Sequence, residues 1–211
     1  MKLLVTAGPT REYIDPIRFL SNRSSGKMGF AIAEAAAARG HEVTLITGPV
    51  LLGTPPEVTR INIESAEEML AAVKKELPGH DALIMSAAVS DFRPKIHARN
   101  KLKKSTMPPV IELVSNPDIL QCVKPEKGNR IFVGFAAETD NIHFEAERKL
   151  REKGLDIIVA NDVTRSDAGF EVDTNRVTLI YPDKEMEKLP LMSKGDLGNK
   201  LIEFIEAKAS L

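Results

Sequence analysis

The sequence has one cysteine and no long apolar stretch. Cys122 stands alone among 211 residues, so no disulfide can form within the chain and a reducing compartment, the cytoplasm, is expected. The longest stretch without a charged residue, residues 43–56, contains two glycines and three prolines and falls short of the roughly 20 apolar residues that a spanning helix needs. The N-terminus lacks the apolar core of a signal peptide. We therefore expect a cytoplasmic protein without a membrane segment.

The chain also lacks a charge excess of either sign. Its 29 Lys and Arg against 30 Asp and Glu leave a net charge of −1, which argues against nucleic acid as a partner. Hydrophobic residues at 43% and charged residues at 28% are ordinary values for a globular protein. The length suits a single domain over residues 1–211.

Several catalytic and metal-binding patterns are missing. The four histidines lack metal-ligand spacing and the lone cysteine has no partner, which disfavours a zinc site. There is no G-x-S-x-G elbow. The glycines near the N-terminus fit neither G-x-x-x-x-G-K-[ST] nor G-x-G-x-x-G.

What is present is an alternation of short apolar runs with segments of helical period. This alternation is typical of βαβ units and predicts an α/β fold, with a Rossmann-like, mostly parallel sheet flanked by helices. The expected strands are residues 2–7, 42–47, 58–63, 81–87, 130–136 and 156–160, and the expected helices are 26–39, 66–76, 119–123, 142–153 and 193–207.

Two segments interrupt this alternation. Residues 88–116 form a long, proline-containing stretch that we interpret as an active-site flap. It carries six basic residues between Arg93 and Lys104, a run that suits either an anionic ligand or a solvated surface. Residues 172–191 contain an alternating strand at 176–181 and a turn at 182–184, so a C-terminal β-hairpin is expected.

Polar loops follow several expected strands. Gly8 ends the first strand, and residues 21–29 lead into the first helix. Ligands of open α/β sheets bind at the carboxyl ends of strands, and helix N-termini offer N–H groups to anions. These loops suit a phosphate, but serine capping with Gly29 packed against the sheet would explain them equally well. Lys149 and Lys153 share a helix face, as ligand contacts or as part of a salt-bridge ladder.

Eight short motifs, taken in order, resemble bacterial phosphopantothenoylcysteine synthetase. They are residues 8–12 (GPTRE), 15–18 (DPIR), 21–29 (SNRSSGKMG), 87–94 (AAVSDFRP), 101–104 (KLKK), 116–120 (NPDIL), 134–139 (GFAAET) and 161–163 (NDV). The resemblance implies a ligase of coenzyme A biosynthesis. In that reaction CTP activates the carboxylate of 4'-phosphopantothenate as an acyl-cytidylate, and L-cysteine then displaces CMP.

The resemblance also implies roles for individual residues. Lys101 would contact the triphosphate and promote activation, and Asn22 would hold the acyl-cytidylate for cysteine. Ala87 and Ala88 would line the substrate side. The residues implied to bind CTP are Gly8, Ser24, Ser25, Gly26, Lys27, Asp91, Lys101, Pro117, Asp118, Ile119, Leu120, Phe135, Lys149 and Lys153.

Cofactors and partners follow from the same resemblance. The triphosphate chemistry implies Mg²⁺, carried mainly by phosphates and water. A homodimer is expected, with the hairpin at 177–191 as its contact, and so is fusion to a flavin-dependent decarboxylase domain in a longer protein. Two alternatives remain open at this point: an NAD(P)-dependent Rossmann oxidoreductase and a non-catalytic nucleotide-binding module.

Overall fold

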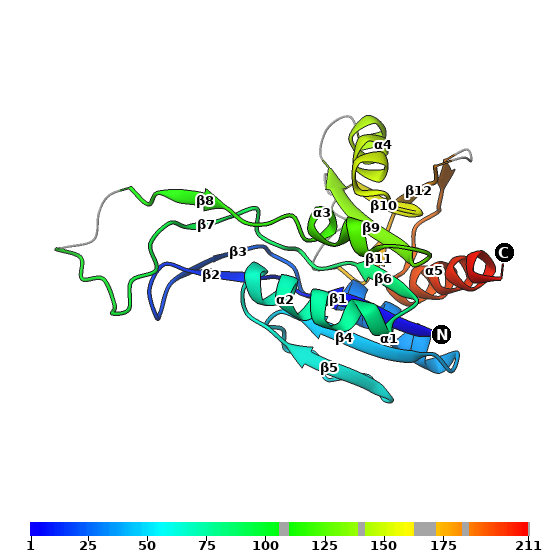
Figure 1. Ribbon diagram of the computed structural model, residues 1–211, viewed down its shortest axis with the longest axis horizontal. Helices are drawn as coiled ribbons and strands as arrows, with labels where there is room; N and C mark the ends of the chain where they lie inside the picture. The colour runs from blue at the N-terminus through cyan, green and yellow to red at the C-terminus, as the bar shows by residue number, and fades with distance from the viewer. Residues whose placement is uncertain (106–109, 139–141, 163–171, 183–185, 211) are drawn as a thin grey trace.

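An eight-stranded sheet forms the centre of the protein in a computed structural model, which describes residues 1–105, 110–138, 142–162, 172–182 and 186–210 (Figure 1). The strand order is β13-β12-β10-β9-β6-β1-β4-β5. From β5 to β10 neighbouring strands are parallel, whereas β12 and β13 continue the edge antiparallel. The bounds are β1 Lys2–Ala7, β4 Glu42–Thr47, β5 Val58–Asn62, β6 Ala82–Met85, β9 Ile131–Glu138, β10 Ile157–Asp162, β12 Val177–Ile180 and β13 Glu187–Lys188.

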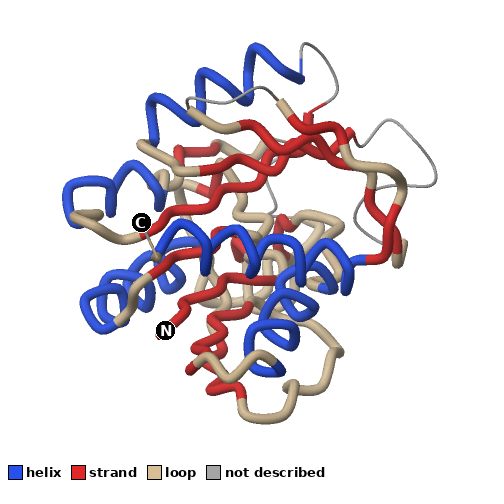
Figure 2. Tube along the Cα trace, turned by 90° about the vertical axis from the view of Figure 1, so that its right-hand side faces the viewer, coloured by secondary structure: helices blue, strands red, loops and turns tan. Residues whose placement is uncertain are grey.

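Helices cover both faces of this sheet (Figure 2). They are α1 Lys27–Ala38, α2 Ala66–Glu76, α3 Ile119–Val123, α4 Ile142–Lys153 and α5 Lys194–Ala209, with short 3₁₀ turns at Leu77–Gly79 and Lys124–Glu126. Leu3 of β1 packs in the cluster with α1 and α5, while Leu4 packs in the cluster with α2, α3 and α4. Successive strand residues point to opposite faces, so a strand covered on both sides is apolar throughout. The predicted fold class is confirmed.

The C-terminal hairpin is confirmed in its described part. β12 pairs with β13, and β12 also pairs antiparallel with β10, so the hairpin extends the central sheet. Residues 183 and 184 of its predicted turn lie outside the described residues. A separate two-stranded sheet joins β11 (Thr174–Asn175) to β14 (Met192–Ser193), immediately before α5.

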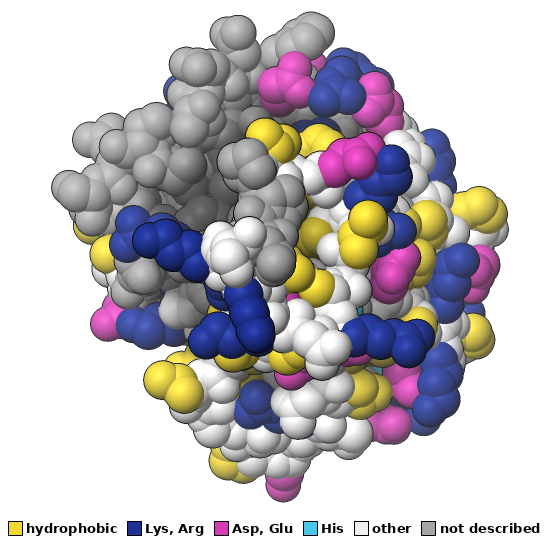
Figure 3. All heavy atoms as spheres, turned by 90° about the vertical axis from the view of Figure 1, so that its left-hand side faces the viewer, with side chains coloured by type: hydrophobic (Ala, Val, Ile, Leu, Met, Phe, Trp, Pro, Cys, Tyr) yellow, Lys and Arg dark blue, Asp and Glu magenta, His cyan; other side chains and the backbone are white. Residues whose placement is uncertain are grey.

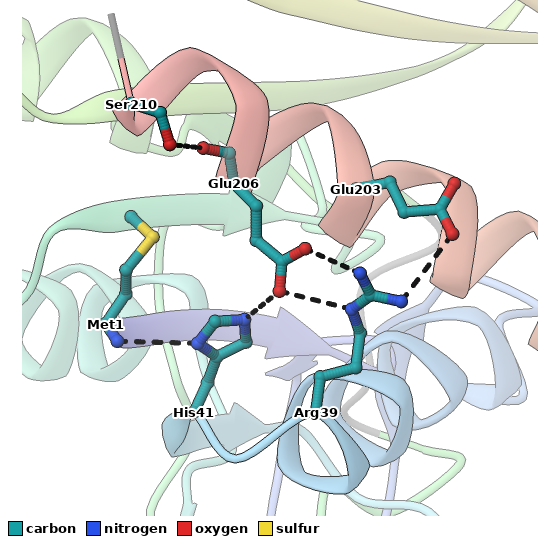
Figure 4. A network of polar contacts seen from close by, with 6 residues as sticks. All are labelled: Met1, Arg39, His41, Glu203, Glu206 and Ser210. Carbon is teal, nitrogen blue, oxygen red and sulfur yellow. Dashed lines mark hydrogen bonds and ion pairs between the residues drawn. The ribbon is translucent and has the colours of Figure 1, made fainter.

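A polar network joins α5 to the end of α1 (Figure 4). Oε2 of Glu206 lies 2.6 Å from Nη2 of Arg39, and Oε1 of Glu206 lies 2.8 Å from Nε2 of His41. The hydrogen bond from Arg39 is the main reason that the pKa of Glu206 falls from 4.5 to about 2. Glu203 lies farther from the guanidinium of Arg39, at 3.5 Å, and is more exposed.

The loop predicted before the first helix and the flap predicted at residues 88–116 contain paired strands and form a long arm, which differs from the expectation. The hairpin of β2 (Arg11–Tyr13) and β3 (Phe19–Ser21) runs beside that of β7 (Phe92–Pro94) and β8 (Leu113–Ser115), away from the central sheet (Figure 1). We call residues 11–21 and 92–105 together with 110–115 the arm. Local patterns missed these strands because each has only three residues.

One buried carboxylate ties the two hairpins of the arm together. Asp15 accepts hydrogen bonds from the backbone N–H groups of Ile17 and Arg18, both at 2.9 Å, and from that of Leu102 at 3.1 Å. The Arg18 guanidinium binds Asp15 and also donates to the Leu102 carbonyl at 2.9 Å. The Arg18 hydrogen bond holds the pKa of Asp15 well below its usual range.

Candidate functional site

The strand order creates an opening at the carboxyl ends of β1 and β6. From β1 the chain passes through α1 to β4 on one side, and from β5 it returns through α2 to β6 on the other side of β1. The loops after β1 and β6 therefore diverge, which is where ligands bind in open α/β sheets. The two loops are joined: the N–H of Ala88 donates to the Gly8 carbonyl at 2.9 Å, and Nδ2 of Asn22 donates to the Ala88 carbonyl at 3.0 Å.

A cavity of about 390 Å³ lies at this opening. The loop before α1 and its first turn form one wall, the loop after β6 forms another, and residues of β9, β10, β11 and α5 close it. The lining residues are Asn22, Ser24, Ser25, Gly26, Lys27, Met28, Gly29, Ser86, Ala87, Ala88, Val89, Asp91, Phe135, Ala136, Asn161, Asn175 and Lys194.

A second cavity of about 230 Å³ adjoins the first and shares Ala87, Val89, Asp91 and Phe135 with it. Its remaining lining residues are Met85, Ser90, Asn116, Pro117, Asp118, Ile119, Leu120 and Lys153. Lys153, the last residue of α4, forms an ion pair at 2.9 Å with Asp118, the N-cap of α3. Because the two cavities share a wall, we treat them as two halves of one cleft: the helix half at α1 and the α3 half.

Most residues predicted to bind ligands line this cleft. They are Asn22, Ser24, Ser25, Gly26, Lys27, Ala87, Ala88, Asp91, Pro117, Asp118, Ile119, Leu120, Phe135 and Lys153. Gly8 lies directly behind the lining, because a Cβ added to Gly26 would be 3.4 Å from Cα of Gly8. Lys149, on the same helix as Lys153, lines neither half.

Lys101 lies apart from the cleft. It is exposed on the arm, and its neighbour Leu102 is bound to Asp15 and Arg18. It lines neither half of the cleft in this arrangement of the chain. The structure thus does not bring the predicted Lys101 and Asn22 together within one chain.

The start of α1 suits an anion. Its N-cap is Gly26, with φ at 79° and no side chain capping the helix. The first N–H groups of a helix have no partner inside it, and here they belong to residues lining the helix half. Gly29 lies against β1 so closely that an added Cβ would be 2.5 Å from Cβ of Ala7. The close packing of Gly29 is confirmed, the serine cap expected with it is wrong because Gly26 is the N-cap, and phosphate binding by this loop stays a prediction.

Two residues from the C-terminal part of the chain also reach the cleft, and sequence reasoning missed them. Asn175 of β11 is 3% exposed and Lys194 at the start of α5 is 6% exposed. Nδ2 of Asn175 donates to Sδ of Met28 at 3.3 Å, and Nζ of Lys194 donates to the Val172 carbonyl. The contact between Asn175 and Met28 joins positions 147 residues apart, so no local pattern signals it.

Arm residues dominate the exposed apolar side chains. Ile17, Phe19, Phe92, Ile96, Val110 and Leu113 are all at least 39% exposed. Figure 3, which faces the arm end of the molecule, shows Lys and Arg side chains gathered across the middle of this face with hydrophobic side chains between them. In the described part of the chain, no helix has the length and apolar character to cross a membrane.

Fold and cleft together define an α/β protein of the Rossmann-like class, with a candidate ligand cleft at the switch point of a parallel sheet. Residues 1–208 match the family described as the DNA/pantothenate metabolism flavoprotein C-terminal domain, and the chain belongs to this family. The resemblance noted in the sequence is confirmed at this level.

Individual relatives agree with this assignment. The chain is 48% identical over 207 residues to the coenzyme A biosynthesis bifunctional protein CoaBC of Vibrio vulnificus strain YJ016; the match covers 97% of the chain and 51% of that protein. The chain thus spans about half the length of the curated relatives it matches. A crystal structure of the C-terminal domain of CoaBC has 42% identity and a TM-score of 0.85, covering 99% of the chain and 95% of its own. A Cab2 H337A mutant in complex with phosphopantothenate-cysteine shares the fold at 15% identity, with a TM-score of 0.79 and coverage of 99% and 87%.

Proposed function

We propose that this chain is the ligase part of a bifunctional coenzyme A biosynthesis protein and joins 4'-phosphopantothenate to L-cysteine at the expense of CTP. The observation that carries the proposal is the division of the cleft into two chemically different halves. The helix half offers the N–H groups at the start of α1, Lys27 and Lys194, whereas the α3 half offers carboxylates, an amide and Lys153 beside the apolar side chains of Ile119 and Leu120. A nucleoside triphosphate has the same division, with a flat base at one end and an anionic chain at the other.

In the proposed complex the base and ribose occupy the α3 half. Carboxylates and amides there, on Asp91, Asn116 and Asp118, suit the amino and hydroxyl groups of a nucleoside. The phosphates extend along the shared wall to α1, where helix N–H groups and positive charge favour anions. The choice of CTP over ATP depends on a few hydrogen bonds to the base. The proposal of CTP is supported by the family resemblance.

The reaction needs no protein nucleophile. A carboxylate oxygen of 4'-phosphopantothenate forms a bond to the α-phosphorus of CTP, and the bond from that phosphorus to the bridging oxygen breaks as pyrophosphate leaves. The amine of cysteine then attacks the acyl carbon, CMP leaves with the bonding electron pair, and the amine proton passes to solvent. Both steps build negative charge on phosphate oxygens, which fixed N–H groups and cations stabilise.

Asn22 lies at the meeting point of the two loops. Its Nδ2 donates to the Ala88 carbonyl, so its side chain is fixed beside Ala87 and Ala88, on the proposed substrate side. This placement suits the role that the resemblance assigns, which is to hold the acyl-cytidylate for attack by cysteine. Substitution of Asn22 by Asp should leave activation intact and stall the reaction before cysteine.

Magnesium is part of the proposal. Among the described residues, no three His, Cys, Asp or Glu side chains gather as a metal-binding group, so the ion would be carried mainly by phosphate and water oxygens. The ion would offset phosphate charge during activation.

The arm supports a further part of the proposal, a homodimer in which Lys101 acts on the cleft of the second chain. Hairpin 177–191 was the predicted contact, but six exposed apolar side chains lie on the arm, which makes the arm the better candidate. The contacts of Leu102 to Asp15 and Arg18 keep Lys101 on the arm, so we expect it to reach a cleft in trans. The cytoplasmic location stays a prediction.

Turnover tests the proposed function. The protein with CTP, Mg²⁺, 4'-phosphopantothenate and cysteine should release pyrophosphate and CMP in equal amounts with the amide, and Lys101→Gln should release little pyrophosphate. Melting shifts with CTP, ATP, GTP, UTP and NAD(P) measure the choice of nucleotide. Absence of pyrophosphate would reject the ligase. Stabilisation by NAD(P) and not by CTP would then favour an oxidoreductase, whereas binding of CTP without turnover would favour a nucleotide-binding module.

A further inference from the structure

One arginine of the arm connects three elements at the edge of the α3 half. Arg93 lies in the middle of β7, where the hairpin of β7 and β8 leaves the body. Its Nη1 donates to the Ser115 carbonyl at 2.7 Å and to Oδ1 of Asn116 at 3.1 Å, and its Nη2 lies 3.0 Å from Oε1 of Glu67. The guanidinium of Arg93 thus ties β7, the loop before α3 and the first turn of α2 together.

The contact with Asn116 reaches the wall of the cleft. Nδ2 of Asn116 donates to the Ser90 carbonyl at 2.8 Å, and the backbone N–H of Asn116 donates to the Asp91 carbonyl at 2.8 Å. Ser90, Asp91 and Asn116 all line the α3 half. Asn116 therefore joins the two segments that form this wall, which are the loop after β6 and the loop before α3.

Arg93 fixes which way the side-chain amide of Asn116 faces. A guanidinium has only donors, so the atom of the amide that it binds has to be the oxygen. Nδ2 then faces the Ser90 carbonyl and donates to it. The reversed amide would set donor against donor at Arg93 and oxygen against oxygen at Ser90. Both contacts therefore select one orientation, and Asn116 presents one arrangement of donor and acceptor to the cleft.

Arg93 itself stands outside the cleft. It lines neither half, its side chain is 32% exposed, and its charge is paired with the carboxylate of Glu67. Glu67 lies in the first turn of α2, where the helix dipole favours an acidic side chain. An exposed ion pair of this kind contributes little to stability. Arg93 can therefore affect a ligand through Asn116 rather than by contact.

We propose that Arg93 is a positioning residue for the nucleoside: by holding Asn116, it sets the wall of the α3 half that the base and ribose of CTP contact. This role rests on the proposed function and adds to it a residue outside the cleft. A contact that holds the nucleoside equally in the bound state and in the transition state changes KM and leaves kcat unaltered. The loss of Arg93 should therefore raise the KM of CTP selectively.

Steady-state kinetics of Arg93→Met, with CTP, Mg²⁺, 4'-phosphopantothenate and cysteine, test this assignment. We expect the KM of CTP to rise about 10-fold, as for the loss of a hydrogen bond to a charged group. The value of kcat and the KM of cysteine should each change less than about twofold. Arg93→Lys keeps a positive charge for Glu67 but lacks the planar fork that binds two oxygens, so its KM of CTP should also rise about 10-fold.

Arg39→Met is the matched control. Arg39 is exposed to a similar extent, 35% against 32% for Arg93, and it also binds a carboxylate, that of Glu206. It is the C-cap residue of α1 and lines neither half of the cleft. Both variants lose a positive charge and an exposed ion pair, so the KM of CTP in Arg39→Met should stay within about twofold of the wild type. A difference between the two variants isolates the contact with Asn116.

The outcomes separate this role of Arg93 from the proposed function. An unchanged KM of CTP in Arg93→Met overturns the role alone. So does a lower kcat with a raised KM for every substrate, which would indicate general damage to the fold; circular dichroism checks the fold of each variant. A wild-type KM of CTP in Arg93→Lys would assign the effect to charge and overturn the role of the fork. A wild type that releases no pyrophosphate overturns the proposed function, and the role of Arg93 with it.

Discussion

Gly29 offers a direct test of the link between the packing of α1 and the cleft. It is the third residue of α1 and lies against the C-terminal end of β1. A Cβ added there would be 2.5 Å from Cβ of Ala7, 2.9 Å from the Thr6 carbonyl oxygen and 3.1 Å from Cα of Ala7. These atoms belong to a buried central strand, so the helix has to move.

Two effects of Gly29→Ala oppose each other, and their sizes decide the sign. Alanine is the better helix former by about 1 kcal/mol. Overpacking a buried contact costs about 1–3 kcal/mol, and the upper part of that range applies when the clash is with backbone rather than with a flexible side chain. The variant should therefore lose about 1–2 kcal/mol of unfolding free energy and bind CTP more weakly, because the helix N–H groups shift.

Urea denaturation measures the free energies, and isothermal titration with CTP measures the affinity. Gly53→Ala is the control: no heavy atom lies within 4 Å of its added Cβ, so the unfolding free energy should stay within about 0.5 kcal/mol of the wild type. If Gly29→Ala proves more stable than the wild type, helix propensity outweighs the contact with β1, and the packing argument is wrong.

Three further predictions address the polar network, the arm and the assembly. Glu206→Gln should lose up to about 1 kcal/mol of unfolding free energy at pH 7, a value discounted because the side chain is a third exposed. Since the pKa of Glu206 is lowered from 4.5 to about 2, its contribution to stability is complete above pH 4.5 and is lost towards pH 2. In acid denaturation the stabilities of the wild type and the variant should therefore converge over that range, and a constant difference would contradict this. Ile96→Asp, at a side chain 77% exposed on the arm, should dissociate the proposed dimer in sedimentation experiments, while Leu51→Asp, at a fully exposed side chain on the body, should not. A dimer that persists in Ile96→Asp would rule out the arm contact. Co-expressed, differently tagged Lys101→Gln and Asn22→Asp chains should regain about half of the wild-type activity per purified mixed dimer. One site of such a dimer combines the unchanged Asn22 of the first chain with the unchanged Lys101 of the second, and the other site carries both substitutions. Inactive mixed dimers would show that Lys101 acts within its own chain.

The central sheet and its helices could be predicted because their patterns are local. Residues 2–7 and 42–47 form strands over the predicted ranges, and 66–76, 119–123 and 142–153 form helices over theirs. In these strands and helices the apolar residues repeat with the period of the secondary structure, and a glycine or proline ends several of these elements. Gly40, with φ at 81°, is one such end after α1.

The arm and part of the site could not be predicted because distant residues determine them. The short strands of the arm depend on Asp15 binding Leu102, 87 positions away. Lys194 could be placed at a helix start but not in a cleft, since its position depends on how β11 and β14 pair. The resemblance named Asn22, Asp91 and Phe135, which line the cleft, but it carried no information on where the arm holds Lys101.

Asp15 has a consequence for how two chains would meet. Its hydrogen bonds to Ile17, Arg18 and Leu102 join both hairpins of the arm before any partner arrives. Ordering loops and side chains at an interface is a main entropic cost of association. Because Asp15 already orders the arm, this loss of entropy occurs during folding and not on association. A second chain would therefore encounter a preorganised surface rather than one that has to be ordered on binding.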